Sequence, residues 1–158
     1  MAILDRKQGA ELCRQWRKDG NSIVFTNGCF DLIHRGHIEN LQTCKSFGDK
    51  LVIGMNSDIS IRKFKEEGRP IITGCDRAVI IDALEVVDLV VLFDEERPQK
   101  LVQELHPDIM VKGDDYKVEE ISGAADVLSW GGRVELIPLK SGYSTSSIID
   151  KIIHIPRK

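Results

Sequence analysis

The chain has 158 residues, a length that suits one domain with a full hydrophobic core. Its hydrophobic fraction of 42% and charged fraction of 30% are typical of a globular protein, and its formal net charge of −3 gives no indication of a basic nucleic-acid-binding surface. No apolar run approaches the roughly 20 residues that cross a bilayer, and charged residues interrupt the N-terminus where a signal peptide is apolar. We therefore expect no membrane and no nucleic-acid partner.

The chain contains four cysteines with no paired spacing: Cys13, Cys29, Cys44 and Cys75. This pattern favours reduced thiols in a cytoplasm over disulfides. No internal repeat or low-complexity segment divides the chain. We expect a single domain over residues 1–158, in which residues 1–20 form an N-terminal helix and residues 154–158 form a loose tail.

Apolar periodicity predicts helices that alternate with strands. The first helix is amphipathic, with Leu12 and Trp16 on one face, and the polar segment 19–21 ends it. The strands are short apolar runs, as in strands that are buried on both faces. In chain order, we expect helices over about residues 5–18, 38–44, 76–84, 98–105, 124–130 and 144–153, and strands over about residues 23–25, 51–55, 88–93, 109–111 and 134–138.

This alternation predicts a five-stranded parallel sheet with helices on both faces, which is an α/β fold of three layers. In such folds, ligands bind outside the carboxyl ends of the strands, near the point where the strand order reverses. The polar segments of this sequence follow its strands, whereas the segments that precede the strands carry nothing comparable. We therefore expect the polar segments to converge on one edge of the sheet and to form a binding site there.

The segment after the strand at residues 23–25 has the residues of an anion site. Gly28 lets the backbone approach a ligand closely or adopt a positive φ. His34 and His37 lie at the start of the next helix, so both rings can face one anion that the free amide groups of the helix start also attract. Zinc is a weaker alternative, because no third Cys, His or carboxylate ligand stands at a recognisable interval.

A second candidate anion site lies at the start of the last helix, where Ser144, Thr145 and Ser146 follow Gly142 and Tyr143. A helix N-cap needs only one hydroxyl residue, so this run of hydroxyl groups favours a phosphate-binding helix start over a simple cap. Two helix starts that point to one edge of the sheet could hold a triphosphate from both sides.

The segment from residue 62 to residue 69 mixes positive and negative side chains. Its positive residues are Arg62, Lys63, Lys65 and Arg69. They form either a solvated helix face or a mobile cationic clamp over phosphates. The charge pattern alone favours the solvated face, whereas the position just after a strand favours the clamp.

The order His34-x-Gly36-His37, after a strand that ends in Thr-Asn-Gly-Cys-Phe-Asp at residues 26–31, resembles the motif of the cytidylyltransferase-like nucleotidyltransferases. Its form is most similar to that of the heptose 1-phosphate adenylyltransferases. The similarity extends over about residues 22–153 and includes the hydroxyl-rich helix start. It therefore covers nearly the whole chain.

Two positions distinguish branches of this family. Leu139-Lys140 stands where the related glycerol-phosphate cytidylyltransferases carry an arginine before their Gly-Ile-Ser-Thr stretch, which argues against that branch. Lys65-Glu66 stands where the heptose 1-phosphate adenylyltransferases usually have Lys-Gly, a difference that could change the flexibility or charge of the clamp.

The resemblance implies a Rossmann-like three-layer α/β/α nucleotidyltransferase fold. It implies transfer of AMP from ATP to D-glycero-D-manno-heptose 1-phosphate, which gives ADP-heptose and pyrophosphate for lipopolysaccharide or another glycan. ATP and a sugar 1-phosphate are thus the expected partners, and a homodimer is the form that the family takes. Mg²⁺ is expected on the triphosphate, with no metal site of the protein's own.

The resemblance also implies roles for individual residues. The implied catalytic residues are His34, His37 and Lys65. The implied nucleotide-binding residues are Thr26, Asn27, Gly28, Cys29, Phe30, Gly36, Lys112, Gly113, Asp115, Tyr143, Ser144, Thr145 and Ser146. The implied acceptor-binding residues are Asp31, Asn56, Asp58, Arg62 and Arg77, although Asp31 could equally brace its own loop.

Two alternatives stay open at this point. The first is a nucleotidyltransferase with another base or acceptor, such as GTP with heptose 1-phosphate or CTP with glycerol 3-phosphate. The second belongs to another class of protein, a nucleotide-binding module without turnover that acts as a sensor or scaffold. The histidine pair, Lys65 and the hydroxyl run count against the module, because binding alone would not need all of them.

Overall fold

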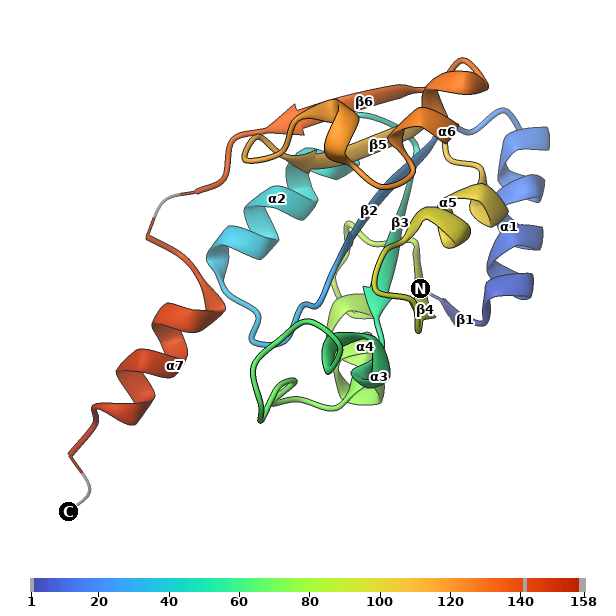
Figure 1. Ribbon diagram of the computed structural model, residues 1–158. Coiled ribbons are helices and arrows are strands. Elements are labelled where there is room, and N and C mark those ends of the chain that lie inside the picture. The colour runs from blue at the N-terminus through green and yellow to red at the C-terminus, as the bar shows by residue number, and fades with distance from the viewer. Residues whose placement is uncertain (1, 141, 157–158) are drawn as a thin grey trace.

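The computed structural model describes residues 2–140 and 142–156 and shows one parallel sheet between layers of helices (Figure 1). The strands are β1 (Ile3–Leu4), β2 (Ile23–Gly28), β3 (Lys50–Asn56), β4 (Leu89–Phe93), β5 (Ile109–Gly113) and β6 (Arg133–Ile137). The helices are α1 (Arg6–Lys18), α2 (Arg35–Lys45), α3 (Asp58–Ile61), α4 (Gly74–Asp82), α5 (Gln99–Leu105), the 3₁₀-helix η1 (Val118–Glu120), α6 (Ala124–Ser129) and α7 (Thr145–Ile153).

The α/β fold with a parallel sheet is confirmed, but the predicted number of five strands is wrong. The sheet has six strands in the order β1-β4-β3-β2-β5-β6. The additional strand, β1, pairs only Ile3 and Leu4 with Val90 and Val91 of β4. Two residues carry no periodicity of their own, and their partner strand lies far away in the sequence, so the pattern of residues could not reveal this strand.

Successive side chains of each strand point to opposite faces of the sheet, which divides the core into two clusters. On one face, Ile23 and Phe25 of β2 pack with buried residues of α1, α5 and α6. On the other face, Val24 packs with buried residues of α2 and α4. Both faces are therefore covered, which explains why the strands are apolar along their whole length.

The strand order places the carboxyl ends of β2, β3 and β5 at the centre of one edge of the sheet. The chain runs from β2 through β3 to β4 in one direction and then returns to β5 and β6 on the other side of β2. The order thus reverses between β2 and β5, which is the point where open α/β sheets bind ligands.

The helix α7 extends away from the rest of the molecule (Figure 1). It has no buried residue, and Ile152 and Ile153 on its apolar stripe are exposed. Its start is well formed, because the Ser144 hydroxyl accepts a hydrogen bond from the Ser147 amide at 3.0 Å. In the described part of the chain, no helix is both long and apolar enough to cross a bilayer.

Candidate functional site

The segment between β2 and α2 makes a tight turn in which Phe30 has a φ of 49°. Of the two roles expected for Gly28, the positive φ is taken by Phe30 instead, at a cost of about 1–2 kcal/mol. Gly28 provides space: a Cβ there would stand 3.2 Å from the Phe30 ring. The turn thus lets the Phe30 ring fold back over the backbone at the end of β2.

The paired histidines lie at the start of α2, where His34 is the N-cap residue. Their rings stack with centroids 3.9 Å apart and an interplanar angle of 25°. Among the residues that the structure describes, Nδ1 of each ring is buried and has no hydrogen-bond partner. These nitrogens therefore have hydrogen-bonding capacity that a bound ligand could use.

Both imidazoles are neutral at pH 7. Burial lowers the pKa of His37 to about 4, and the neighbouring His34 lowers it further in the same direction. Burial also lowers the pKa of His34. Each neutral ring has one N–H donor and one nitrogen acceptor, so the pair can donate hydrogen bonds to an anion.

Gly36 is needed for the approach of the last helix to the histidines. A Cβ at Gly36 would stand 3.1 Å from both the His34 ring and Cβ of Tyr143. The rings of His34 and Tyr143 have centroids 6.3 Å apart. The Thr145 hydroxyl also donates a hydrogen bond to the Leu32 carbonyl at 3.3 Å, which ties the start of α7 to the segment after β2.

The histidines and the hydroxyl-rich start of α7 line one cavity of about 400 Å³, which we call the histidine cavity. His34, His37 and Phe30 line it from the segment after β2, and residues 143–146 line it from the start of α7. Lys65 and Arg69 add positive charge from the segment after α3. With Lys140, three cations and two helix starts thus surround one space, which suits a polyanion.

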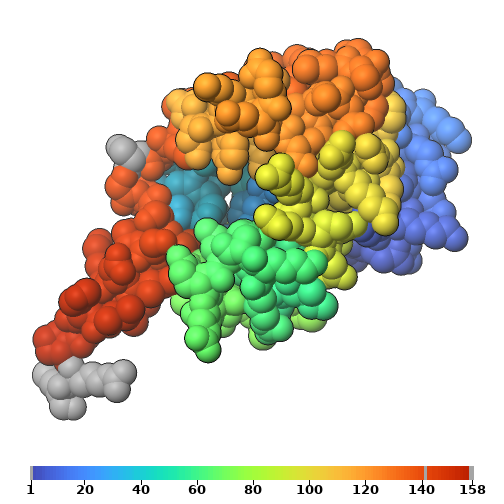
Figure 2. Space-filling model, in the orientation of Figure 1, coloured from blue at the N-terminus to red at the C-terminus, as the bar shows by residue number. Residues whose placement is uncertain are grey.

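A second cavity of about 420 Å³ lies next to the histidine cavity, and both are lined by Cys29 and Lys65. Of the predicted nucleotide-binding residues, Asn27, Gly28 and Lys112 line the second cavity. Figure 2 shows the hollow between the segment after β3, in green, and the segment after β5, in orange. The two cavities together form a continuous site along the carboxyl edge of the sheet.

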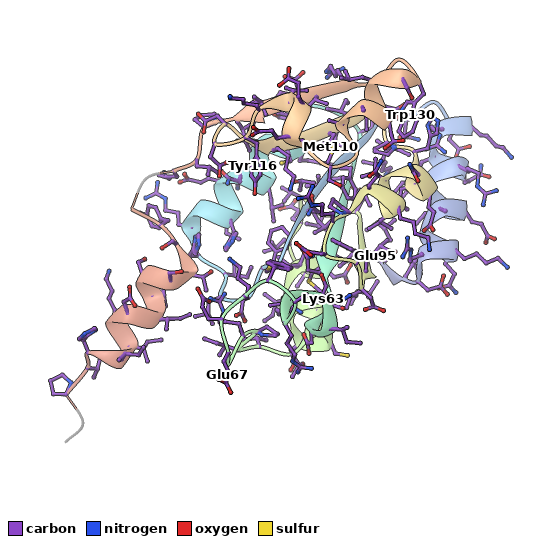
Figure 3. The ribbon with its side chains drawn as sticks, in the orientation of Figure 1. Lys63, Glu67, Glu95, Met110, Tyr116 and Trp130 are labelled. Carbon is purple, nitrogen blue, oxygen red and sulfur yellow. The ribbon has the colours of Figure 1, made fainter. Side chains whose placement is uncertain are left out.

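Lys65 is the exposed cation that lines both cavities, and with Arg62 it also lines a third hollow beside residues 66–70. The segment from 62 to 69 thus lies next to the cavities, and its role as a clamp over phosphates stays a prediction. Lys63, labelled in Figure 3, lines none of these spaces and instead donates a hydrogen bond to the Asp94 carbonyl at 2.8 Å.

Asp31 holds the clamp segment in place. Its carboxylate accepts hydrogen bonds from Nε of Arg69 at 2.7 Å and from the amides of Ile71 and Ile72 at 2.9 Å. Burial alone would raise the pKa of Asp31, but these hydrogen bonds and the charge of Arg69 outweigh it and keep the pKa below its ordinary value. The carboxylate is thus occupied in bracing the loop, although Asp31 lines the histidine cavity.

Arg77 lies beneath the site and has no exposed surface. Its guanidinium donates hydrogen bonds to the carbonyls of Cys29, Asn56 at 3.0 Å and Ile72 at 3.0 Å, and forms an ion pair with Asp58 at 2.7 Å. These contacts join the segments after β2 and β3 with the N-terminal turn of α4. Neither Arg77 nor Asp58 lines either cavity, in contrast to Asn56, which lines the second.

Three other predicted nucleotide-binding residues, Thr26, Gly113 and Asp115, line neither cavity. Thr26 is buried within β2. A Cβ at Gly113 would stand 2.5 Å from the Asp115 carboxylate, so the glycine lets the segment after β5 fold closely. The neighbouring Lys112 is different: burial lowers its pKa to about 8 while the Asp115 carboxylate opposes this shift, and its ammonium stands 5.7 Å from the Tyr116 ring centroid.

The structure also brings residues to the cavities that no sequence pattern indicated. Asn40 and Lys140 line the histidine cavity, and Glu96, Arg97, Glu120 and Ser122 line the second cavity. Glu96 and Arg97 lie between β4 and α5, Glu120 lies in η1, and Ser122 follows η1. Both segments follow strands, and this position is the feature of the sequence that could have indicated them. Their charge pattern, however, is that of ordinary solvent-exposed residues.

The candidate site does not offer a protein cage for a metal ion. Within residues 2–140 and 142–156, no group of three or more His, Cys, Asp or Glu side chains is placed to hold a metal ion. The Asp31 carboxylate is engaged by Arg69 and two amides. A divalent cation at this site would therefore take its ligands from bound phosphate oxygens and water.

Comparison with known proteins places the chain in a family. Residues 25–151 match the model of a family described as cytidylyltransferase-like. Similar proteins include the bifunctional protein HldE of Geobacter metallireducens, which is 53% identical over 134 residues that make up 85% of this chain and 27% of that protein. The bifunctional protein HldE of Wolinella succinogenes is 47% identical over 150 residues, or 95% of this chain and 31% of that protein.

The chain thus spans less than a third of the length of these bifunctional relatives. Among solved structures, it is similar to the lipopolysaccharide core biosynthesis protein from Thermoplasma volcanium, with 32% identity and a TM-score of 0.64. That match covers 79% of this chain and all of the other. With the family model, the relatives and the parallel sheet in agreement, the chain belongs to the cytidylyltransferase-like family.

Proposed function

We propose that the chain transfers AMP from ATP to D-glycero-D-manno-heptose 1-phosphate and releases pyrophosphate. The observation that carries this proposal is the single cavity that the histidine pair and residues 143–146 line together. The acceptor follows from the motif resemblance to the heptose 1-phosphate adenylyltransferases and from the similarity to the HldE proteins. Four free cysteines also suit a cytoplasmic enzyme.

In the proposed reaction, an oxygen of the sugar 1-phosphate attacks the α-phosphorus of ATP. A new P–O bond forms, the bond to the bridging oxygen breaks, and its electron pair leaves with pyrophosphate. Such a transfer needs an in-line arrangement and compensation of the charge on the phosphoryl oxygens rather than a covalent intermediate. Magnesium, bound through the triphosphate, would supply part of that compensation.

The protein residues supply the remaining positive charge and hydrogen-bond donors. His34 and His37, as neutral rings, would donate to oxygens of the α- and β-phosphates. Residues 144–146 would hold the β- and γ-phosphates at the start of α7. Lys65 lines both cavities and would therefore bridge the attacking and the leaving phosphates.

A matrix of substrates tests the proposal. Pyrophosphate release is measured with ATP, GTP and CTP, each against the two anomers of heptose 1-phosphate, hexose 1-phosphates and glycerol 3-phosphate. We expect release with ATP and one heptose 1-phosphate anomer. Release with GTP, or with CTP and glycerol 3-phosphate, would assign another base or acceptor, and no release with any pair would leave a nucleotide-binding module. A homodimer, which sedimentation would detect, is part of the same proposal.

A further inference from the structure

The second cavity has a chemical character that differs from that of the histidine cavity. Its wall contains two carboxylates, Glu96 and Glu120, which come from the segments after β4 and β5. In the described part of the chain, neither carboxylate forms an ion pair with an Arg, Lys or His. These acceptors therefore stay available to a ligand that donates hydrogen bonds.

Neutral polar groups complete this wall. Asn27, Asn56 and Ser122 line the cavity, and Oδ1 of Asn27 is buried without a hydrogen-bond partner among the described residues. A buried carbonyl oxygen without a partner costs about 1–3 kcal/mol, which a ligand donor would recover. The amide of Asn56 already donates to the Ser60 hydroxyl at 2.8 Å, so that group is held in a fixed orientation.

Two aromatic rings and three cations also line the cavity. The rings belong to Phe64 and Tyr116, and the cations are Lys65, Arg97 and Lys112. Tyr116 and Glu95, labelled in Figure 3, mark the segments after β5 and β4 that meet at this cavity. The second cavity has a volume of about 420 Å³ and is lined by flat rings, carboxylates, amides and three cations, of which Lys65 also lines the histidine cavity. This lining suits a small polar ligand with one phosphate.

The second cavity suits a triphosphate less well than the histidine cavity, because Glu96 and Glu120 offset two of its three cations. Glu96 and Glu120 leave the second cavity with little net positive charge, whereas the histidine cavity offers two helix starts and three cations. Hydroxyl groups, in contrast, donate to carboxylates in charge-assisted hydrogen bonds, which are about twice as strong as neutral ones. A polyhydroxylated chain with a phosphate at one end thus complements this wall, its phosphate lying toward Lys65.

We propose that the second cavity binds the polyhydroxylated part of the sugar 1-phosphate and that Glu96, Glu120 and Asn27 select it by accepting hydrogen bonds from its hydroxyl groups. This inference rests on the proposed function, since it identifies the cavity in which the acceptor of that reaction binds. It separates two tasks: the histidine cavity binds the nucleotide phosphates, and the segments after β4 and β5 determine which acceptor is used. Asn27, which the resemblance assigns to the nucleotide, is thereby assigned to the acceptor.

Kinetics of single variants test the assignment. Glu96→Ala and Glu120→Ala should each raise the KM for the sugar 1-phosphate about 10-fold, as expected for the loss of a hydrogen bond to a charged group, and change the KM for ATP less than about twofold. Glu96→Gln and Glu120→Gln keep an acceptor oxygen and should restore part of the affinity. Glu119→Ala is the matched control, because Glu119 is the adjacent carboxylate of η1 and does not line the second cavity.

Two results would overturn the assignment: a rise in the KM for ATP without a rise for the sugar, or no change in either. Calorimetric titration of the wild type and the Glu96→Ala/Glu120→Ala double variant with the sugar 1-phosphate, in the presence of a non-hydrolysable ATP analogue, separates this failure from failure of the proposed function. Binding that the double variant loses would support the cavity assignment even without turnover. Absence of sugar binding to the wild type would refute it.

Discussion

His37 has an environment that shifts its protonation far from that of a free side chain. Its Nδ1 is buried without a partner in the described part of the chain, its ring stacks on His34 at 3.9 Å, and its pKa falls to about 4. A neutral donor fixed at a helix start adds to the stabilisation of negative charge without reorganisation during the reaction. The contribution of this residue should therefore appear in turnover rather than in folding.

We expect His37→Ala to lower the turnover number at least 100-fold, which is the loss typical of removing one preorganised donor to a developing negative charge. Pyrophosphate release measures the rate, and circular dichroism with thermal unfolding checks that the variant is folded. His154→Ala is the control, since His154 is an exposed histidine at the end of α7. Near wild-type release by His37→Ala would contradict the role.

The pKa of His37 also links stability to pH. An unfolded chain protonates this histidine near pH 6.5, whereas the folded chain does so only near pH 4, so acid favours unfolding between these values. The contribution to the free energy of unfolding should thus be complete above about pH 6.5 and decrease by up to roughly 3 kcal/mol toward pH 4.

Denaturant unfolding at several pH values measures this dependence. His37→Gln should unfold with a shallower pH dependence between about pH 6.5 and pH 4 than the wild type, because no proton is taken up at this position. An unchanged slope in His37→Gln would mean that His37 titrates normally in the folded protein.

At the scale of the elements, two buried charged side chains hold the loops of the site together. Arg77 joins the segments after β2 and β3, and Asp31 joins the segment after β2 to the clamp through Arg69. Three chain segments therefore converge on two buried charged side chains. This arrangement explains why Asp58 and Arg77, which the resemblance suggests as acceptor-binding, line neither cavity.

We expect Arg77→Met to lower the free energy of unfolding by about 3 kcal/mol, because the Asp58 carboxylate and three carbonyl groups lose their partner. Urea unfolding measures this loss. Arg62→Met, at an exposed position of the clamp, should change it by less than about 0.5 kcal/mol. A variant of Arg77 that unfolds like the wild type but binds the acceptor weakly would instead support the acceptor-binding role.

Periodicity and turn residues were sufficient to predict the order of the long elements and both parts of the histidine cavity. The histidine pair follows β2, and residues 144–146 follow β6. They lie together because both strands end at the same edge of the sheet. The two-residue β1, the left-handed Phe30 and the second cavity could not be predicted. Each depends on contacts between segments distant in sequence, which leave no periodic pattern.

At the scale of the whole molecule, the site depends on a helix that contributes little to the core. The two core clusters include no residue of α7. We therefore expect a chain that ends at residue 140 to unfold cooperatively with a midpoint close to that of the full chain. It should lose pyrophosphate release at least 100-fold, since residues 144–146 are absent.

Urea unfolding and the release assay on the same preparation test this expectation. The control is Ile153→Ser in the full chain, which changes an exposed residue at the far end of α7 and should leave both measurements unchanged. A truncated chain that does not fold would mean that α7 stabilises the core, and a truncated chain that stays active would mean that its helix start is dispensable.

Lys65, at the junction of the two cavities, has a consequence for the making of new enzymes from this scaffold. The residues of the histidine cavity come mainly from the segments after β2, after α3 and before α7, whereas Glu96 and Glu120 come from the segments after β4 and β5. Grafting those two loops from a relative with a different sugar should therefore yield a catalyst for a new nucleotide sugar while the donor chemistry stays intact.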